Sequence, residues 1–98
     1  MTIIEINDSF KKIYKDKDTL SYDKIYDLFK NYVNKSSEHL YEKMLLNKDI
    51  FTTEDIIKET WLNFWLQCTD NQIIIKNIDE LHQIFVDIIY DVVVEFNN

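Results

Sequence analysis

The sequence predicts an all-α domain, a single small bundle of four to five helices. Gly and Pro are both absent from the 98 residues, whereas all-β folds depend on these residues for their tight turns. Hydrophobic residues make up 46% of the chain and aromatic residues 14%, which is enough apolar surface to build a core. Apolar residues also recur every three or four positions, the spacing of one helix face.

Residues 1–20 are expected to form a short peripheral helix and its connection, and residues 21–98 the main bundle of a single domain. The first helix is expected to follow the cap candidates Asn7 and Asp8, and the solvated run Lys15 to Asp18 to end it. A long helix with Ser21 as its cap comes next. The pair Ser36-Ser37 lies in the middle of this helix, where serine can bond to the preceding turn, so a bend or break is one alternative.

The stretch TTEDIIKETWLNFWLQ, residues 52–67, is expected to begin a third helix. Thr52 and Asp55 have the spacing of a capping box. Ile56 and Thr60 lie on a flank of the expected core stripe, and Leu62 and Leu66 lie on the opposite side. Because apolar residues occupy two faces, this helix is either central in the bundle or partly reserved for contact with another chain. The stripe consists of Ile57, Trp61, Phe64, Trp65 and Cys68.

A short extended connector is expected around Ile73 to Ile75, with the isoleucines packed as a lid over the core. The pair Asn77 and Glu80 then signals the start of the last helix. Its expected buried stripe comprises Leu81, Ile84, Phe85, Ile88, Ile89, Val92, Val93 and Phe96.

The charge balance argues against direct binding of nucleic acid. Eighteen carboxylates face eleven basic residues, all of them lysine, and the net charge is −7. Phosphate contacts need cationic side chains, and arginine makes the commonest contact to a base edge. One cysteine excludes an internal disulfide, and neither a leader nor an apolar run of membrane-spanning length is apparent. We therefore expect a cytoplasmic protein with no membrane association.

No pattern in the sequence predicts catalysis. His39 and His82 lie on different predicted helices without zinc-site spacing, and Cys68 follows the tryptophans as a small buried residue would. The absence of glycine excludes the familiar phosphate-binding loops and nucleophile elbows. We expect no enzyme activity, no cofactor and no metal.

Two patterns favour a protein-binding function. The first is a row of carboxylates along one side of the last helix, at Glu80, Asp87, Asp91 and Glu95, with no lysine after Lys76. One interpretation is a face that only solubilises the protein. The other is an acidic inhibitor, either a nucleic-acid mimic or an immunity-type protein of a phage or mobile element, that blocks the basic cleft of a nuclease or another DNA-binding enzyme.

The second pattern is the order Asp55-Ile56-Ile57-Lys58-Glu59-Thr60-Trp61, followed by Phe64-Trp65. It resembles the helix in region 2 of bacterial sigma factors that grips the clamp helices of RNA polymerase, and the resemblance extends over about residues 22–98. It implies a transcription-related protein that binds RNA polymerase or another host protein through the outward residues Asp55, Lys58, Glu59 and Leu62.

Three departures from the sigma pattern qualify what it implies. Lys58 stands where the family has a glutamine, acidic residues replace the promoter-binding basic residues of the last helix, and we expect no second, promoter-reading domain. The resemblance therefore implies a protein-binding face without promoter contact. A third option is a homodimer in which the third helix pairs with itself, and the sequence leaves the oligomeric state open.

Overall fold

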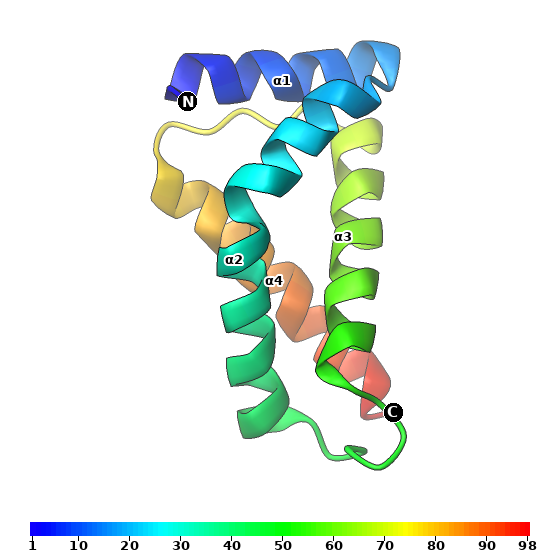
Figure 1. The fold of residues 1–98 in the computed structure, drawn as a ribbon. Coiled ribbons are helices and arrows are strands. Elements are labelled where there is room, and N and C mark those ends of the chain that lie inside the picture. Colours follow the sequence, from blue (N-terminus) through cyan, green and yellow to red (C-terminus); the bar gives the residue numbers. More distant parts are fainter.

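The computed structural model describes all of residues 1–98 and confirms the all-α bundle, with four helices and no strand. The helices are α1 (Ile3–Asp16), α2 (Thr19–Met44), α3 (Thr53–Asp70) and α4 (Ile78–Phe96). Figure 1 shows α1 lying across one end of the bundle, with α2 and α3 running away from it and α4 crossing behind them. No helix of the bundle is both long and apolar enough to cross a membrane.

Helix α1 begins earlier than the sequence predicted, because Thr2 and not Asn7 or Asp8 is its cap. The backbone N–H of Glu5 donates to the Thr2 hydroxyl over 3.2 Å, and the Glu5 carboxylate accepts from the Thr2 backbone N–H over 3.4 Å. The helix lies at one end of the bundle, and its inner side is part of the core. Ile6, Phe10 and Ile13 are at most 1% exposed, so α1 closes one end of the core.

Helix α2 runs without a break through Ser36 and Ser37, so the alternative of two separate helices was wrong. Its cap is Asp18, whose carboxylate accepts hydrogen bonds from the Leu20 backbone N–H at 3.1 Å and from the Ser21 hydroxyl at 2.7 Å. The predicted cap Ser21 is therefore a helical residue that supports the true cap.

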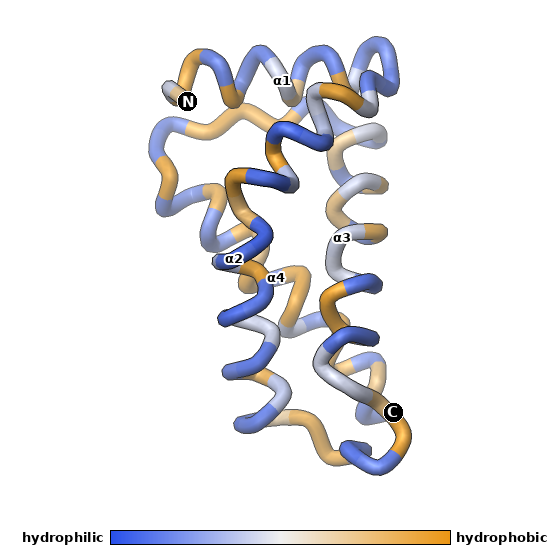
Figure 2. Tube along the Cα trace, in the orientation of Figure 1, coloured by the Kyte–Doolittle hydropathy of each residue, from blue (hydrophilic) through white to orange (hydrophobic).

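A single hydrophobic core joins all four helices. The rings of Phe10, Phe64 and Phe85 come from three of them and are fully buried, with centroids 6.1 Å apart between the first two and 4.6 Å between the last two. Figure 2 shows hydrophobic positions recurring among hydrophilic ones along the helices. Six members of the expected α4 stripe are buried, while Ile84 and Phe96 lie at its margin.

The buried face of α3 differs from the expected stripe by about one residue. Ile56 and Thr60, which the sequence placed on a flank, are fully buried, whereas Ile57 and Trp65 are only partly buried. Because Trp61, Phe64 and Cys68 are buried as expected, the face is turned by less than the roughly 100° that separates successive helix residues. The direction is set by α1, α2 and α4, all of which pack against α3.

Hydrogen bonds from asparagine side chains fix the segments at both ends of α4. Before its start, Ile75 in the connector between α3 and α4 forms hydrogen bonds with the side chain of Asn7 of α1. Ile75 is 2% exposed but Ile74 is 71% exposed, so only part of the predicted isoleucine lid is buried. After its end, the Asn97 amide donates to the Met44 carbonyl at 2.9 Å and accepts from the Leu46 N–H at 2.8 Å. The C-terminus is thereby held beside the connection between α2 and α3 (Figure 1).

Candidate protein-binding face

The start of α3 is fixed by the capping box that the sequence predicted. The carboxylate of Asp55 accepts from the Thr52 backbone N–H at 2.8 Å and from the Thr52 hydroxyl at 3.2 Å, and the Asp55 N–H donates to that hydroxyl at 3.3 Å. Asp55 therefore stabilises the helix end as well as facing outward. Any test of Asp55 in binding has to separate these two roles.

The tryptophans of α3 belong to the core and not to an exposed aromatic surface. Trp61 is 8% exposed, and its ring packs against Tyr26 at 4.8 Å and Phe85 at 5.3 Å between centroids. Trp65 is partly buried, and its ring meets that of Tyr22 at 5.0 Å. The side of α3 that remains for a partner is the one formed by its exposed and partly buried residues away from the core.

The four residues of the sigma-like pattern share that remaining side of α3. Lys58 is exposed and Leu62 is 52% exposed, while Asp55 and Glu59 are partly buried. Asp55 is three and four residues before Lys58 and Glu59, and these are four and three residues before Leu62, so the four lie on one side of the helix and form a row. A hollow of about 420 Å³ lies beside the row, lined by Ile50, Phe51, Asp55, Lys58, Glu59 and Phe96.

The structure divides the acidic row of α4 into two parts. Glu80 accepts from the Lys76 backbone N–H at 2.8 Å, and Asp87 accepts from the Gln83 amide at 2.8 Å, so both carboxylates have partners within their own segment. Asp91 and Glu95 are exposed and line a groove between α3 and α4.

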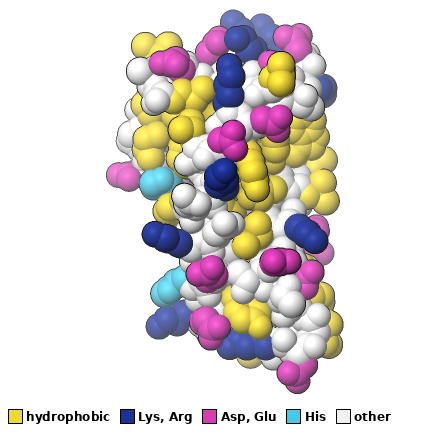
Figure 3. Space-filling model, viewed as in Figure 1, with side chains coloured by type: hydrophobic (Ala, Val, Ile, Leu, Met, Phe, Trp, Pro, Cys, Tyr) yellow, Lys and Arg dark blue, Asp and Glu magenta, His cyan; other side chains and the backbone are white.

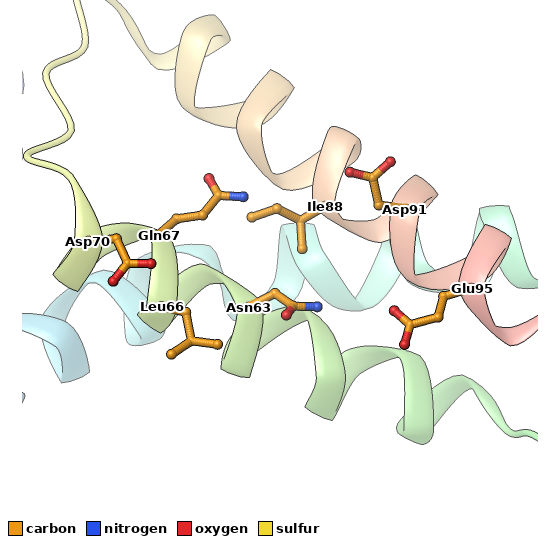
Figure 4. A pocket seen from close by; sticks show the side chains of 7 residues that line it. All are labelled: Asn63, Leu66, Gln67, Asp70, Ile88, Asp91 and Glu95. Atoms are coloured by element: carbon orange, nitrogen blue, oxygen red, sulfur yellow. The ribbon is translucent and has the colours of Figure 1, made fainter.

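This groove contains a carboxylate that the sequence analysis missed. Asp70, the last residue of α3, lines it together with Asp91 and Glu95 of α4. Figure 4 shows Gln67 and Ile88 pointing toward one another across the groove, which has a volume of about 320 Å³. No local signal marks Asp70, because its position depends on how the two helices pack.

The two predicted sets of residues lie along the same pair of helices. Glu59, which lines the hollow, and Asn63, which lines the groove, are one turn apart on α3, and Glu95 and Phe96 are neighbours on α4. The hollow and the groove therefore adjoin and form one surface, which we name the α3–α4 face. Its carboxylates are Asp55, Glu59, Asp70, Asp91 and Glu95.

The charge of the protein is concentrated in the half of the chain that builds this face. Residues 49–98 hold ten carboxylates and two lysines, a net charge of −8, whereas residues 1–48 hold eight carboxylates and nine lysines, a net charge of +1. Figure 3 shows lysines and carboxylates interspersed on the side where α2 lies in front. The α3–α4 face therefore has an electrostatic preference for a cationic partner.

The single cysteine and the two histidines lie on three different helices. Cys68 is 1% exposed, and burial raises the pKa of its thiol to about 12, which keeps it protonated and away from solvent. His39 is exposed on α2, while the His82 ring stacks on Tyr32 with 3.9 Å between centroids. No three His, Cys, Asp or Glu side chains are grouped so as to hold a metal ion.

Comparison with protein-family models, with curated proteins and with solved structures finds no match for this chain. Support for a function therefore comes from the surface itself.

Proposed function

We propose that this protein is a non-catalytic protein-binding module, similar to region 2 of sigma factors, that engages RNA polymerase through the outer side of α3. The observation that carries the proposal is the orientation of α3. The tryptophans face the core, and Asp55, Lys58, Glu59 and Leu62 are left as one outward row. A cytoplasmic location, as expected from the sequence, is part of the proposal.

The composition of α4 supports a protein partner and not promoter DNA. Asp91 and Glu95 are exposed on α4, which contains no lysine. Binding of DNA depends on cations that neutralise phosphates, and a carboxylate opposes this. The proposed module therefore binds polymerase without contacting the promoter strand.

A binding assay with purified bacterial core RNA polymerase tests the proposal. Lys58→Ala/Leu62→Ala removes the two most exposed members of the row and should weaken binding at least tenfold. Lys24→Ala/Leu28→Ala is the matched control, because it changes the same residue types at the same spacing on α2, and Leu28 is 48% exposed against 52% for Leu62. Failure of the wild-type protein to bind polymerase, or equal weakening by both double variants, would reject the proposal.

A second candidate is favoured by the concentration of negative charge on the α3–α4 face. Here the protein is an acidic inhibitor whose carboxylates occupy the basic cleft of a nucleic-acid-binding enzyme in place of phosphates. Asp70, Asp91 and Glu95 line one groove, and like charges gathered without a cation are stabilised by a cationic partner.

The inhibitor candidate is tested by DNA cleavage with a panel of basic nucleases at low and high salt. Inhibition should fall as salt rises, and Asp91→Lys/Glu95→Lys should abolish it. The matched control Glu38→Lys/Glu42→Lys makes the same change of charge, one turn apart on α2, and should leave inhibition intact. This candidate fails if no nuclease is inhibited or if the control variant loses inhibition equally.

A further inference from the structure

A second groove lies between α2 and α4, apart from the α3–α4 face. It has a volume of about 320 Å³, at the lower end of the range of about 300 to 1,000 Å³ typical of small-molecule sites. Five of its lining residues come from α2 and one from α4: Tyr32, Lys35, Ser36, His39, Leu40 and Val86.

The floor of this groove is apolar and is held in place by the core. Tyr32 and Leu40 are partly buried and pack against the core, and Val86 is also partly buried. The Tyr32 ring is stacked on His82 with an angle of 11° between the ring planes, and the His82 ring in turn meets Phe29 of the core at 6.0 Å. An aromatic wall fixed in this way offers a preformed surface for an apolar group.

The rim of the groove is basic, whereas the lining of every other hollow of the molecule includes a carboxylate. Lys35 and His39 are exposed and one turn apart on α2, and no carboxylate lines the groove. Each of the three other hollows contains at least one carboxylate. In a protein of net charge −7, this is therefore the one hollow that is lined by a lysine and by no carboxylate, a lining that favours an anion.

We infer that the α2–α4 groove binds an amphipathic organic anion, a molecule with an apolar chain or ring and a single carboxylate. The apolar part lies over Leu40, Val86 and the Tyr32 ring. The carboxylate accepts hydrogen bonds from the Lys35 ammonium and the His39 ring at the rim. This site is independent of the proposed polymerase-binding function, because none of its residues belongs to the α3–α4 face.

Octanoate is a suitable probe, with binding followed through the backbone amide signals of the isotope-labelled full chain in NMR. Saturable shifts are expected around Lys35, His39 and Val86. Octanamide, which has the same chain without the charge, should bind about fivefold more weakly, as expected for losing an ion pair with the exposed Lys35 ammonium. Acetate, which has the charge without the chain, should produce no saturable shift at these residues.

Two variants test the assignment to this groove. Lys35→Ala/His39→Ala should weaken octanoate binding about fivefold. The control Lys11→Ala/Lys15→Ala removes two basic side chains that are likewise exposed and one turn apart, but on α1, and it should bind like the wild type. Absence of saturation, shifts scattered over other surfaces, octanamide binding as tightly as octanoate, or equal affinities for the two variants would overturn the inference.

Discussion

The side-chain amide of Asn7 makes both a donated and an accepted hydrogen bond with the backbone of Ile75, which is 68 residues away in the sequence. The amide nitrogen donates to the Ile75 carbonyl over 2.8 Å, and the amide oxygen accepts from the Ile75 N–H over 2.9 Å. Ile75 is 2% exposed, so water has little access to these backbone groups. The asparagine thus provides the pairing that a neighbouring strand would supply to an extended segment.

Replacement of Asn7 by Ala should lower the free energy of unfolding by about 1 to 3 kcal/mol, because it leaves two buried backbone groups of Ile75 without partners. Urea denaturation followed by circular dichroism measures the change. Asn31→Ala, at an exposed position on α2, is the control and should alter stability by less than about 0.5 kcal/mol. Equal effects at the two positions would show that the Asn7 contact contributes no stability.

The sequence predicted the helices of this fold better than the contacts between them. Repeats of three and four residues are local, so the buried face of α4 could be identified from the spacing of residues such as Phe85 and Ile89. The role of Asn7 could not be identified from the sequence, because the same side-chain amide can cap a helix or form hydrogen bonds with a distant backbone segment. Only the packing of α1 against the connector distinguishes the two.

For the candidate site too, positions along one helix could be predicted from the sequence, whereas contacts between helices could not. The spacing of Lys58 and Leu62 placed both on one side of α3, and the structure shows both exposed. That Asp70 would join Asp91 and Glu95 in one groove required the positions of α3 and α4 relative to each other. Helix periodicity has no information about that arrangement.

The two roles of Asp55 can be separated by substitution. Asp55→Gln removes the charge but retains a side chain that serves in capping boxes, so it should cost less than about 0.5 kcal/mol, whereas Asp55→Ala should cost about 1 kcal/mol. Thermal unfolding measures both. If the carboxylate also contacts polymerase, Asp55→Gln should weaken polymerase binding while stability is kept. Equal loss of stability in the two variants would show that glutamine does not replace the cap here.

Truncation of Phe85 tests whether its ring joins the helices through the core. Phe85 is fully buried, and the centroid of its ring lies within 6 Å of the ring centroids of Phe29, Trp61 and Phe64. Phe85→Ala should destabilise the protein by about 3 to 5 kcal/mol, through lost burial and the cavity that remains. Tyr90→Ala, an aromatic truncation at a position on the same helix that is 47% exposed, should cost far less in the same urea measurement. Similar costs at both positions would contradict the packing described for α4.

Burial of Cys68 and Tyr22 should make the protein less stable in alkali. Desolvation raises the pKa of the Cys68 thiol to about 12 and raises that of the Tyr22 hydroxyl as well. The two groups cost no stability at a pH where both the folded and the unfolded chain keep these protons. Above about pH 8.5 the unfolded thiol ionises while the folded one does not, and above about pH 10 the same holds for the tyrosine. Each group should then lower the free energy of unfolding by up to about 1.4 kcal/mol per pH unit.

Urea unfolding of the wild type at half-unit steps between pH 8 and pH 11 measures this decrease in the free energy of unfolding. Two variants show which part of the decrease each group causes. Cys68→Ala should remove the part that begins near pH 8.5. Tyr22→Phe keeps the ring that packs on Trp65 but loses the hydroxyl that donates to the Trp61 carbonyl at 2.7 Å, and it should remove the part that begins near pH 10. Other titrating groups are common to all three proteins and cancel in the difference between profiles. Profiles of the variants that run parallel to that of the wild type would show that neither buried group is linked to folding.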